Sequence, residues 1–167
     1  MIEMPLVRRM GEDEWAQVRE IRLAALQDAP TAFASTYERE AAFDEAIWRS
    51  RTRTAAWFVA CEGTRAVGLV AGRHEEGALA AERHVVSFWV APDCRGRGVA
   101  GALLDAVVDW ARDQGADVVT LWVVDGNEPA TRLYVRHGFQ PTGERQPVLG
   151  SVSAIESKLA LRLSACG

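Results

Sequence analysis

A glycine-rich turn that opens a helix near the middle of the chain limits what this sequence can fold into and bind. An apolar run over residues 85–90, typical of a strand, leads through a short turn to Gly96 and Gly98, after which an amphipathic helix begins. Glycine lets the backbone approach a ligand closely, and the first N–H groups of a helix have no intrahelical acceptor and favour negative charge. The turn therefore predicts a phosphate or pyrophosphate site, with positive charge added by Arg95 and Arg97.

The same turn also matches a dinucleotide-binding fingerprint, G-x-G-x-x-G over residues 96–101, and a second strand follows that ends at Asp125. In that fingerprint the first glycine comes almost directly off the strand, whereas residues 91–95 intervene here. The turn lies past the middle of the 167-residue chain, so too few residues follow Asp125 to build a second mononucleotide-binding half. These features disfavour a dinucleotide cofactor.

A second pattern uses more of the chain, over residues 85–139. It reads V-x-P-x-x-R-G-x-G-x-A, then a helix and a strand, then N-x-x-A-x-x-L-Y-x-x-x-G-F. With both halves in this order and at this separation, the chain resembles the GNAT superfamily of acyl-CoA-dependent N-acyltransferases. The matching residues are Val90, Pro92, Arg95, Gly96, Gly98, Ala100, Asn127, Ala130, Leu133, Tyr134, Gly138 and Phe139.

The resemblance implies an α/β fold that forms a single N-acetyltransferase domain over residues 1–167. Its sheet is expected to be mixed and mostly antiparallel, with one splayed parallel strand pair and helices on both faces. In the family, the gap between the splayed strands admits the pantetheine arm of acetyl-CoA, the co-substrate. The cofactor-binding residues implied are Phe88, Trp89, Val90, Arg95, Gly96, Arg97, Gly98, Val99, Ala100, Asn127 and Tyr134, although Arg97 can also be a solvated surface charge.

Hydrophobic periodicity gives a coarse secondary structure that agrees with this fold. A strand, a helix and a strand over residues 85–124 predict a right-handed crossover between parallel strands. Hairpins elsewhere predict antiparallel pairing. Helices are expected over residues 13–26, over 36–51 with a break near Asp44, from Val99 to a cap at Gly115, and between Pro129 and Gly138; strands are expected over 6–10, 55–61, 66–72, 84–90, 118–124, 140–144 and 157–163.

Composition excludes several classes of partner. The net charge of −4 disfavours a nucleic-acid partner, which needs a basic patch. No apolar run reaches membrane-spanning length and residues 1–5 lack a secretory signal, so we expect a cytoplasmic protein with no membrane partner. Cys61, Cys94 and Cys166 are odd in number and far apart, so we expect free thiols and no metal site. A homodimer is compatible with the sequence, which carries no clear mark of an interface.

Tyr134 lies on one helical face with Ala130, Leu133 and His137, a placement typical of a core aromatic residue. In the resembled family a tyrosine here holds its hydroxyl near the cofactor sulfur, where a donor can protonate the departing thiolate. A tyrosine hydroxyl, with an ordinary pKa of about 10, keeps its proton at neutral pH and favours this role. Asn127 likewise has two compatible roles, as a helix N-cap and as a contact to the CoA arm.

An alkylammonium acceptor must lose a proton before it attacks a thioester. Some family members use a glutamate or histidine shortly before the valine that ends the first parallel strand. That position is His84 here, a residue type whose ordinary pKa of about 6.5 suits a base, although a strand-end histidine can equally have no role. Glu82 is the second candidate. Ribosomal-protein acetyltransferases of the family carry a glutamate at the end of the second parallel strand, where this chain has Asp125 and a shorter link to Asn127, which disfavours a protein acceptor.

The acceptor site is expected between the N-terminal helices and the first hairpin. Aromatic side chains and an acid there could hold a cationic amine, although core aromatics and a solvated helix face would give the same pattern. We therefore predict an acetyltransferase that moves an acetyl group from acetyl-CoA to a primary amine of a small molecule or peptide by direct attack. A non-catalytic acyl-CoA-binding module and a protein N-terminal or lysine acetyltransferase remain alternatives. The candidate acceptor-lining residues are Phe33, Tyr37, Glu38, Trp48 and Trp57.

Overall fold

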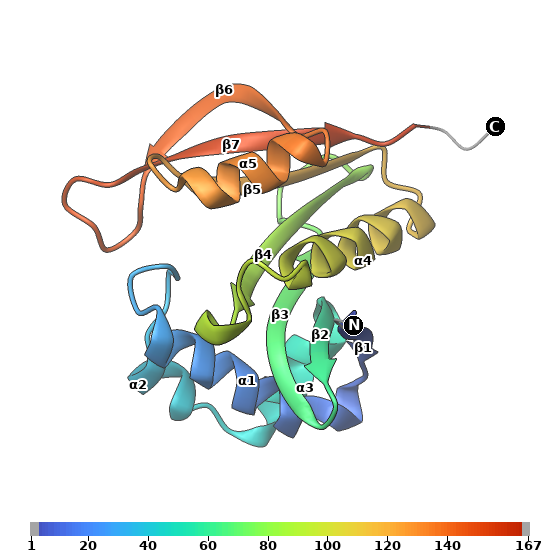
Figure 1. Cartoon of the computed structure of the whole chain (residues 1–167), viewed down its shortest axis with the longest axis vertical. Coiled ribbons are helices and arrows are strands. Elements are labelled where there is room, and N and C mark those ends of the chain that lie inside the picture. The colour runs from blue at the N-terminus through green and yellow to red at the C-terminus, as the bar shows by residue number, and fades with distance from the viewer. Residues whose placement is uncertain (1–3, 165–167) are drawn as a thin grey trace.

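The computed structural model describes residues 4–164 of the chain (Figure 1). The predictions for residues 1–3 and for the thiol of Cys166 lie outside this range. Cys61 and Cys94 are both free thiols, and Cys94 is buried.

A seven-stranded sheet forms the centre of the molecule, with the strand order β1-β2-β3-β4-β5-β7-β6. All neighbouring strands are antiparallel except β4 and β5, which are parallel, so the predicted mixed sheet with one parallel pair is confirmed. The strands are β1 (Leu6–Met10), β2 (Ala56–Glu62), β3 (Arg65–Arg73), β4 (Glu82–Val90), β5 (Val118–Val124), β6 (Gln140–Pro147) and β7 (Ile155–Arg162).

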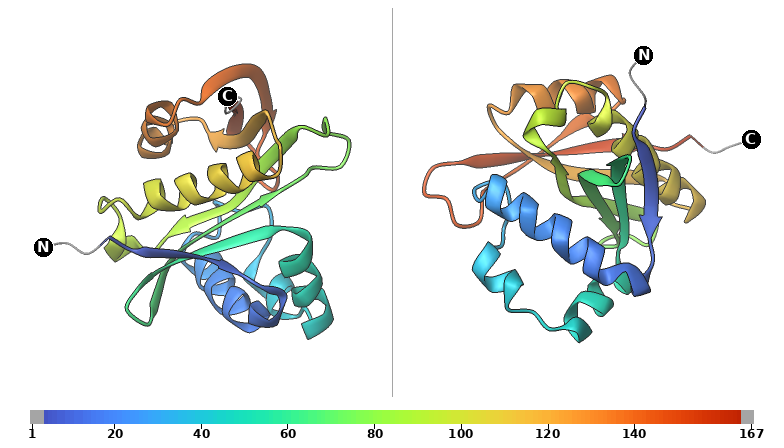
Figure 2. Two further views of the ribbon diagram at one scale, coloured as in Figure 1. Left: turned by 90° about the vertical axis from the view of Figure 1, so that its right-hand side faces the viewer. Right: turned by 60° about the horizontal axis from the view of Figure 1, so that its bottom comes forward.

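Helices cover both faces of the sheet, as predicted. Figure 2 shows α4 on one face and α1 and α3 on the other. Helix α5 lies beside α4, where His137 Nε2 is 3.2 Å from an Asp105 carboxylate oxygen. No helix formed by residues 4–164 is long and apolar enough to span a bilayer. The helices are α1 (Trp15–Asp28), α2 (Tyr37–Ala41), α3 (Glu45–Thr54), α4 (Val99–Asp113) and α5 (Glu128–Arg136), with short 3-10 turns at Glu12–Glu14 and Pro92–Cys94.

The predicted break in the second helical region is confirmed, and its cause is a capping residue. The Asp44 carboxylate accepts a hydrogen bond from the backbone N–H of Ile47 at 3.0 Å and so begins α3. The Thr36 hydroxyl oxygen begins α2 in the same way, by accepting from the Arg39 N–H at 3.2 Å. Two short helices result where one long helix would otherwise run.

The parallel strands β4 and β5 pair only at their beginnings. The last partners in this pair are His84 and Thr120, beyond which the two strands separate. On its other edge β4 pairs with β3, where Leu69 faces Trp89 and Ala71 faces Val86, so two residues of β4 oppose one of β3. Such a bulge bends a strand and increases its twist. Ser87, inside the bulge, has a φ of +59°, which is uncommon for any residue except glycine.

Helix α4 lies very close to β3 because two strand residues have no side chain. A Cβ atom at Gly72 would come within 2.5 Å of the Trp110 ring, and one at Gly68 would come within 2.8 Å of Leu103 Cδ1. The buried leucines and valines of α4 fill the remaining space over the sheet. This packing fixes the height and position of the helix, including its first turn.

We expect the Gly72→Ala variant to lower the free energy of unfolding by about 1–3 kcal/mol, the usual cost of overpacking a tight core. Gly101→Ala is the matched control. It adds the same methyl group to α4, where the nearest atom, on His137, is 3.7 Å away. The control should be neutral or stabilising by up to about 1 kcal/mol, because alanine has the higher helix propensity. Urea unfolding of both variants tests this, and equal effects would contradict the close packing of α4 on β3.

Candidate active site

A cleft of about 1320 Å³ opens where β4 and β5 separate. One part of its wall comes from α5, on the α4 side of the sheet, and includes Asn127 and Tyr134. Another part comes from the opposite side, from α1, α2 and the segment between them, and includes Arg22 and Phe33. The gap between the strands therefore joins the two faces of the sheet. Two reactants could enter it from opposite sides and meet at the strands.

The predicted phosphate site lies at the start of α4. Gly96 and Gly98 have φ values of +76° and +85°, and a Cβ atom at either position would meet nothing within 4 Å. The first helical hydrogen bond runs from the Ala102 N–H to the Gly98 carbonyl at 3.1 Å. The N–H groups of Val99 and Ala100 therefore have no acceptor within the helix. Val99 is 1% exposed, so the predicted contact of Val99 with a cofactor is not supported. The exposed glycines and the half-buried Ala100 leave polarised N–H groups that can donate to an anionic group.

The two arginines of the glycine loop (residues 95–98) both have protein partners. Arg95 Nη2 lies 3.1 Å from an Asp28 carboxylate oxygen, and Arg95 Nε donates to the Val90 carbonyl at 3.1 Å. The exposed Arg97 pairs with Glu62 at 3.1 Å. Arg95 thus ties the loop to the end of β4 and to α1. Their roles at a phosphate stay predictions, and the backbone amides are the groups left open to an anion.

The end of β4 presents its backbone to the cleft. Beyond His84 the edge of β4 that faces β5 has no strand partner, so backbone groups there are open to a ligand. Phe88 lines the cleft. The side chains of Trp89 and Val90 are buried, and Trp89 Nε1 donates to Asp28 at 2.9 Å. For these two residues, only the main chain is available to a cofactor.

Tyr134 combines the two roles that its helical position suggests. It is 8% exposed and packs between Phe88 and Phe139, with ring centroids 6.1 and 5.9 Å away. It also lines the cleft from α5. Burial raises the pKa of its hydroxyl to about 12, so the group keeps its proton over the whole physiological range. The arrangement gives the cleft a fixed, protonated hydrogen-bond donor.

Asn127 also combines two roles. Its side-chain oxygen accepts a hydrogen bond from the Ala130 N–H at 3.3 Å and so caps α5. The residue lines the cleft as well, beside the opening between the strands. The cap uses only the oxygen, which leaves the amide NH₂ group available to a ligand.

His84 lies at the junction where β4 and β5 separate. It is 6% exposed, lines the cleft, and places Nδ1 2.7 Å from the Thr120 hydroxyl. Its Nε2 is 3.8 Å from a Glu75 carboxylate oxygen. Burial lowers the pKa of His84 to about 4, against an opposing effect of Glu75. The imidazole is therefore neutral at neutral pH, which is the form that a base needs, although the low pKa makes it a weak base.

The other acids near the opening differ in their freedom to act. Glu82 lines the cleft at the start of β4, on the same strand as His84. Asp125, at the end of β5, is held by Arg145 and by the Ser157 hydroxyl, whose oxygen is 2.7 Å away. These hydrogen bonds lower the pKa of Asp125 and keep it an anion. Within residues 4–164, no three His, Cys, Asp or Glu side chains are grouped to hold a metal ion.

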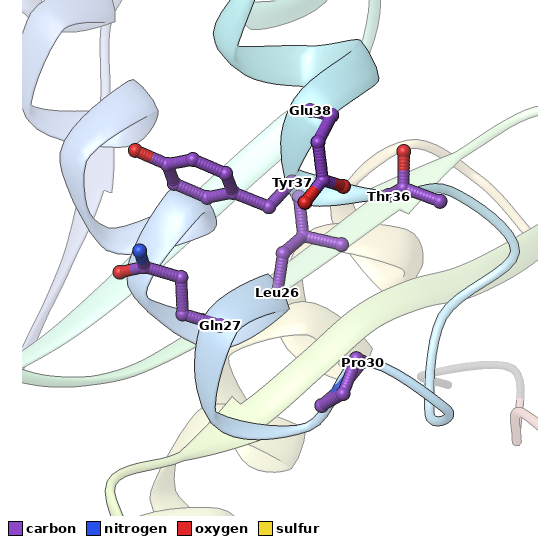
Figure 3. Close-up of a pocket in the computed structure, with 6 residues that line it drawn as sticks. All are labelled: Leu26, Gln27, Pro30, Thr36, Tyr37 and Glu38. Carbon is purple, nitrogen blue, oxygen red and sulfur yellow. The ribbon is translucent and has the colours of Figure 1, made fainter.

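The predicted acceptor-lining residues divide into three groups. Phe33 lines the cleft, as expected. Tyr37 and Glu38 instead line a separate pocket of about 430 Å³ between the end of α1 and the start of α2 (Figure 3). The prediction is wrong for Trp48 and Trp57, which are 0% and 3% exposed and belong to the core. Both are aromatic residues on the inner face of their elements, where burial of a large apolar ring outweighs access to a ligand.

Several polar residues of the cleft were not predicted from the sequence, and Thr120 and Arg22 are the most informative of them. Thr120 is the polar residue within the otherwise apolar run of β5. Arg22 lies on the buried face of α1, one turn after Val18 and one turn before Leu26. A polar residue at an apolar position of a periodic pattern was the signal that could have revealed both. Glu40 pairs with both Arg22 and Arg51, and neither Glu40 nor Arg51 carries such a signal.

Comparison with known proteins gives a consistent result. Residues 15–139 match the family model described as Acetyltransferase (GNAT) family. The chain is 31% identical over 144 residues to the L-amino acid N-acyltransferase MnaT of Escherichia coli, a match that covers 77% of this chain and 83% of that protein. It is 35% identical over 92 residues to N-acetyltransferase 8F1 of Rattus norvegicus, which covers 54% of this chain but only 42% of the rat protein. The chain thus spans less than half the length of that relative.

A solved structure shares the fold over nearly the whole chain. The structure of yncA from Salmonella typhimurium, determined with its cofactor acetyl-CoA, superposes with a TM-score of 0.75. The superposition covers 98% of this chain and 96% of that one, at 20% sequence identity. At this identity the likeness shows the fold alone.

We expect the stability of the protein to report the burial of His84. Its pKa of about 4 in the folded chain is below the ordinary value of about 6.5, so the unfolded chain binds the proton first as the pH falls. Stability from the neutral imidazole is complete above pH 6.5 and is lost as the pH falls toward 4. Between pH 7 and pH 5, the wild type should lose about 2 kcal/mol more unfolding free energy than His84→Gln. Urea unfolding at both pH values measures the difference, and equal losses would show that His84 is not buried as a neutral group.

Proposed function

The chain belongs to the GNAT family of acetyltransferases, and we propose that it transfers an acetyl group from acetyl-CoA to a primary amine of a small molecule or peptide. The observation that carries this proposal is the cleft through the sheet, which is lined by titratable side chains, together with the glycine loop that precedes α4. The amine attacks the thioester directly, without a covalent acyl-enzyme. The cleft joins both faces of the sheet, as a reaction between two separately bound substrates requires.

The residues present fit acetyl-CoA. The open amides at the start of α4 suit a pyrophosphate, and the two glycines keep that surface free of side chains. The unpaired edge of β4 offers backbone donors and acceptors to the amide groups of a pantetheine arm. Asn127 and Tyr134 line the cleft between the separated strands. When bound, acetyl-CoA supplies an activated acetyl group as a thioester.

The chain's own groups then perform three tasks. Backbone N–H groups at the open edge of β4 polarise the thioester carbonyl. His84 or Glu82 accepts the proton that the ammonium group must lose before attack. Because the His84 imidazole is neutral at neutral pH, it can take up this proton. The nearby Glu75 carboxylate would stabilise the imidazolium that forms.

Tyr134 acts on the leaving group. The thiol that forms when the leaving thiolate takes up a proton has an ordinary pKa of about 8.5. This value is well below the pKa of about 12 that burial gives to the Tyr134 hydroxyl. Complete proton transfer from Tyr134 to the thiolate is therefore uphill. A hydrogen bond from the hydroxyl to the developing negative charge on sulfur is favourable, and it is strongest as the C–S bond breaks.

Binding of acetyl-CoA and CoA should raise the melting temperature, while NAD and NADP should not. The Gly98→Glu variant should lower CoA affinity by at least about 100-fold, because it places a carboxylate where the phosphates would lie and like charges repel by several kcal/mol. Gly115→Glu is the matched control, since Gly115 has a similar φ of +78° but lies at the other end of α4. Calorimetric titration of both variants with CoA measures the difference.

An unchanged CoA affinity in Gly98→Glu would place the pyrophosphate elsewhere. A thermal shift with NAD and none with CoA would contradict the proposed function altogether. If acetyl-CoA binds but no amine in a broad panel releases free thiol, the chain is a non-catalytic acyl-CoA-binding module instead.

The Tyr134→Phe variant should lower kcat by about 100-fold, the usual effect of removing one hydrogen-bond donor to the charge that develops in the transition state. The ring contacts with Phe88 and Phe139 remain, so the fold and the affinity for acetyl-CoA should be preserved. Because the hydroxyl stays protonated, the loss should be the same from about pH 6 to pH 9. Tyr37→Phe, which changes the chain's other tyrosine in a separate pocket, should leave kcat unaltered. Equal kcat in wild type and Tyr134→Phe would remove the hydroxyl from the mechanism.

A further inference from the structure

The helical wall of the cleft carries a buried cluster of charges that the acetyl-transfer steps do not use. Arg22 Nε and Nη2 donate to the two carboxylate oxygens of Glu40 at 3.1 and 2.9 Å. Arg51 Nη1 donates to Glu40 Oε1 at 2.6 Å. All three residues line the cleft. Two arginines share one carboxylate, so this cluster (Arg22, Glu40 and Arg51) has an excess positive charge inside the protein.

Arg22 has a donor group without a partner. The residue is 5% exposed, and its Nη1 is buried with no acceptor among the described residues. The pairing with Glu40 occupies Nε and Nη2, on one edge of the guanidinium, so Nη1 points away from that carboxylate. A buried, unpaired donor on a charged group is costly, typically 1–3 kcal/mol or more. An anionic ligand group that accepted from Nη1 would remove this cost.

Aromatic rings hold the two guanidinium groups in place. The Phe33 ring centroid lies 4.5 Å from Arg22 Cζ, and the Trp48 ring centroid lies 4.7 Å from Arg51 Cζ. Both arginines are thus fixed between aromatic faces and the Glu40 carboxylate. A ligand would bind them without ordering two long side chains, which lowers the entropic cost of recognition.

The part of the cleft lined by the strands and by the loop after β3 has the reverse character. His84 faces it from the strand junction, with Glu75 at 3.8 Å. Arg73, its partner in the β3–β4 register, is neutralised by two hydrogen bonds to Glu75. Carboxylates outnumber cations on this side, and they suit an ammonium group. The charged residues of this wall are Arg73, Glu75, Glu76, Glu82, Glu156 and Lys158, whereas the helical wall contributes Arg22, Arg39, Glu40 and Arg51.

We propose that the acceptor is a free amino acid or a similar small amino-carboxylic acid, an inference that rests on the function proposed above. Its carboxylate accepts a hydrogen bond from Arg22 Nη1, with Arg51 adding positive charge, and its amine lies toward His84 and Glu75. A peptide N-terminus has no carboxylate beside its amine, so it would leave Arg22 Nη1 unpaired. The charge pattern of the cleft therefore selects small zwitterionic acceptors over peptides.

The first experiment compares acceptors on the wild-type protein. Each common L-α-amino acid is assayed against its own carboxamide, with acetyl-CoA as donor and free thiol as the readout. The best acid should exceed its amide in kcat/KM by about 10-fold or more, since a hydrogen bond to a charged group contributes about 1.5–3 kcal/mol. Amides or peptides that match or exceed the acids would overturn the proposal, as would a protein that binds acetyl-CoA but acetylates neither.

The second experiment changes the proposed contact. Arg22→Lys keeps one positive charge next to Glu40 but removes Nη1, so KM for the acid should rise by about 10-fold or more with little change in kcat. The weaker reaction with the amide should be unaffected. Arg53→Lys is the matched control, because Arg53 is an exposed arginine of α3 that pairs with Glu12 and does not line the cleft. The preference of this variant for acids should stay unchanged.

The outcomes separate this proposal from the one on which it rests. Binding of acetyl-CoA to the wild type and to each variant is measured first by calorimetry. If the wild type does not bind acetyl-CoA, the acetyltransferase function and the acid preference are contradicted together. Normal binding of acetyl-CoA by Arg22→Lys, with the acid preference intact, would contradict the role of Arg22 alone. If Arg22→Lys does not fold, the comparison of acids and amides on the wild type still decides the acceptor class.

Discussion

The early end of the β4–β5 pairing is the constraint on which the rest of the structure depends. A parallel pair normally continues along the strands, but here it stops at His84 and Thr120. The bulge around Ser87 bends β4 away from β5 while β4 stays paired with β3. The strands open where apolar core would otherwise lie, and this opening creates the cleft, the free strand edge and the route between the two faces.

Burial sets the ionisation of the groups around this opening in opposite directions. It lowers the pKa of His84 to about 4 and raises that of Tyr134 to about 12, so both are neutral at physiological pH. Burial alone would raise the pKa of Glu40, but Arg22 and Arg51 outweigh it and lower the value to about 2. The cleft is thus uncharged at His84 and Tyr134 and firmly charged at the helical wall. A reaction that moves one proton and binds a charged substrate benefits from this division.

The sequence predicts the fold well because its information is local and periodic. The break near Asp44, the helix between Pro129 and Gly138, and the two halves of the family motif all come from short patterns. The glycine loop could be located for the same reason. The cluster formed by Arg22, Glu40 and Arg51 could not, because it joins three separate helices and hydropathy treats each member as a surface residue. Trp48 and Trp57 were wrongly predicted to line the acceptor site, because an aromatic residue has the same sequence pattern in a core and in a binding cleft.

The pairing of the loop arginines has a consequence for how the protein would hold an anion in solutions of different ionic strength. Arg95 is compensated by Asp28, Arg97 by Glu62 and the neighbouring Arg65 by Asp93. The attraction that remains comes from fixed backbone dipoles at the start of α4 rather than from a net positive surface. Dissolved salt screens exposed charges over about 8–10 Å but has little effect on a direct contact between an amide and a phosphate. A polyanion bound at the glycine loop, as proposed, would therefore be retained at salt concentrations that would release it from a surface of free arginines.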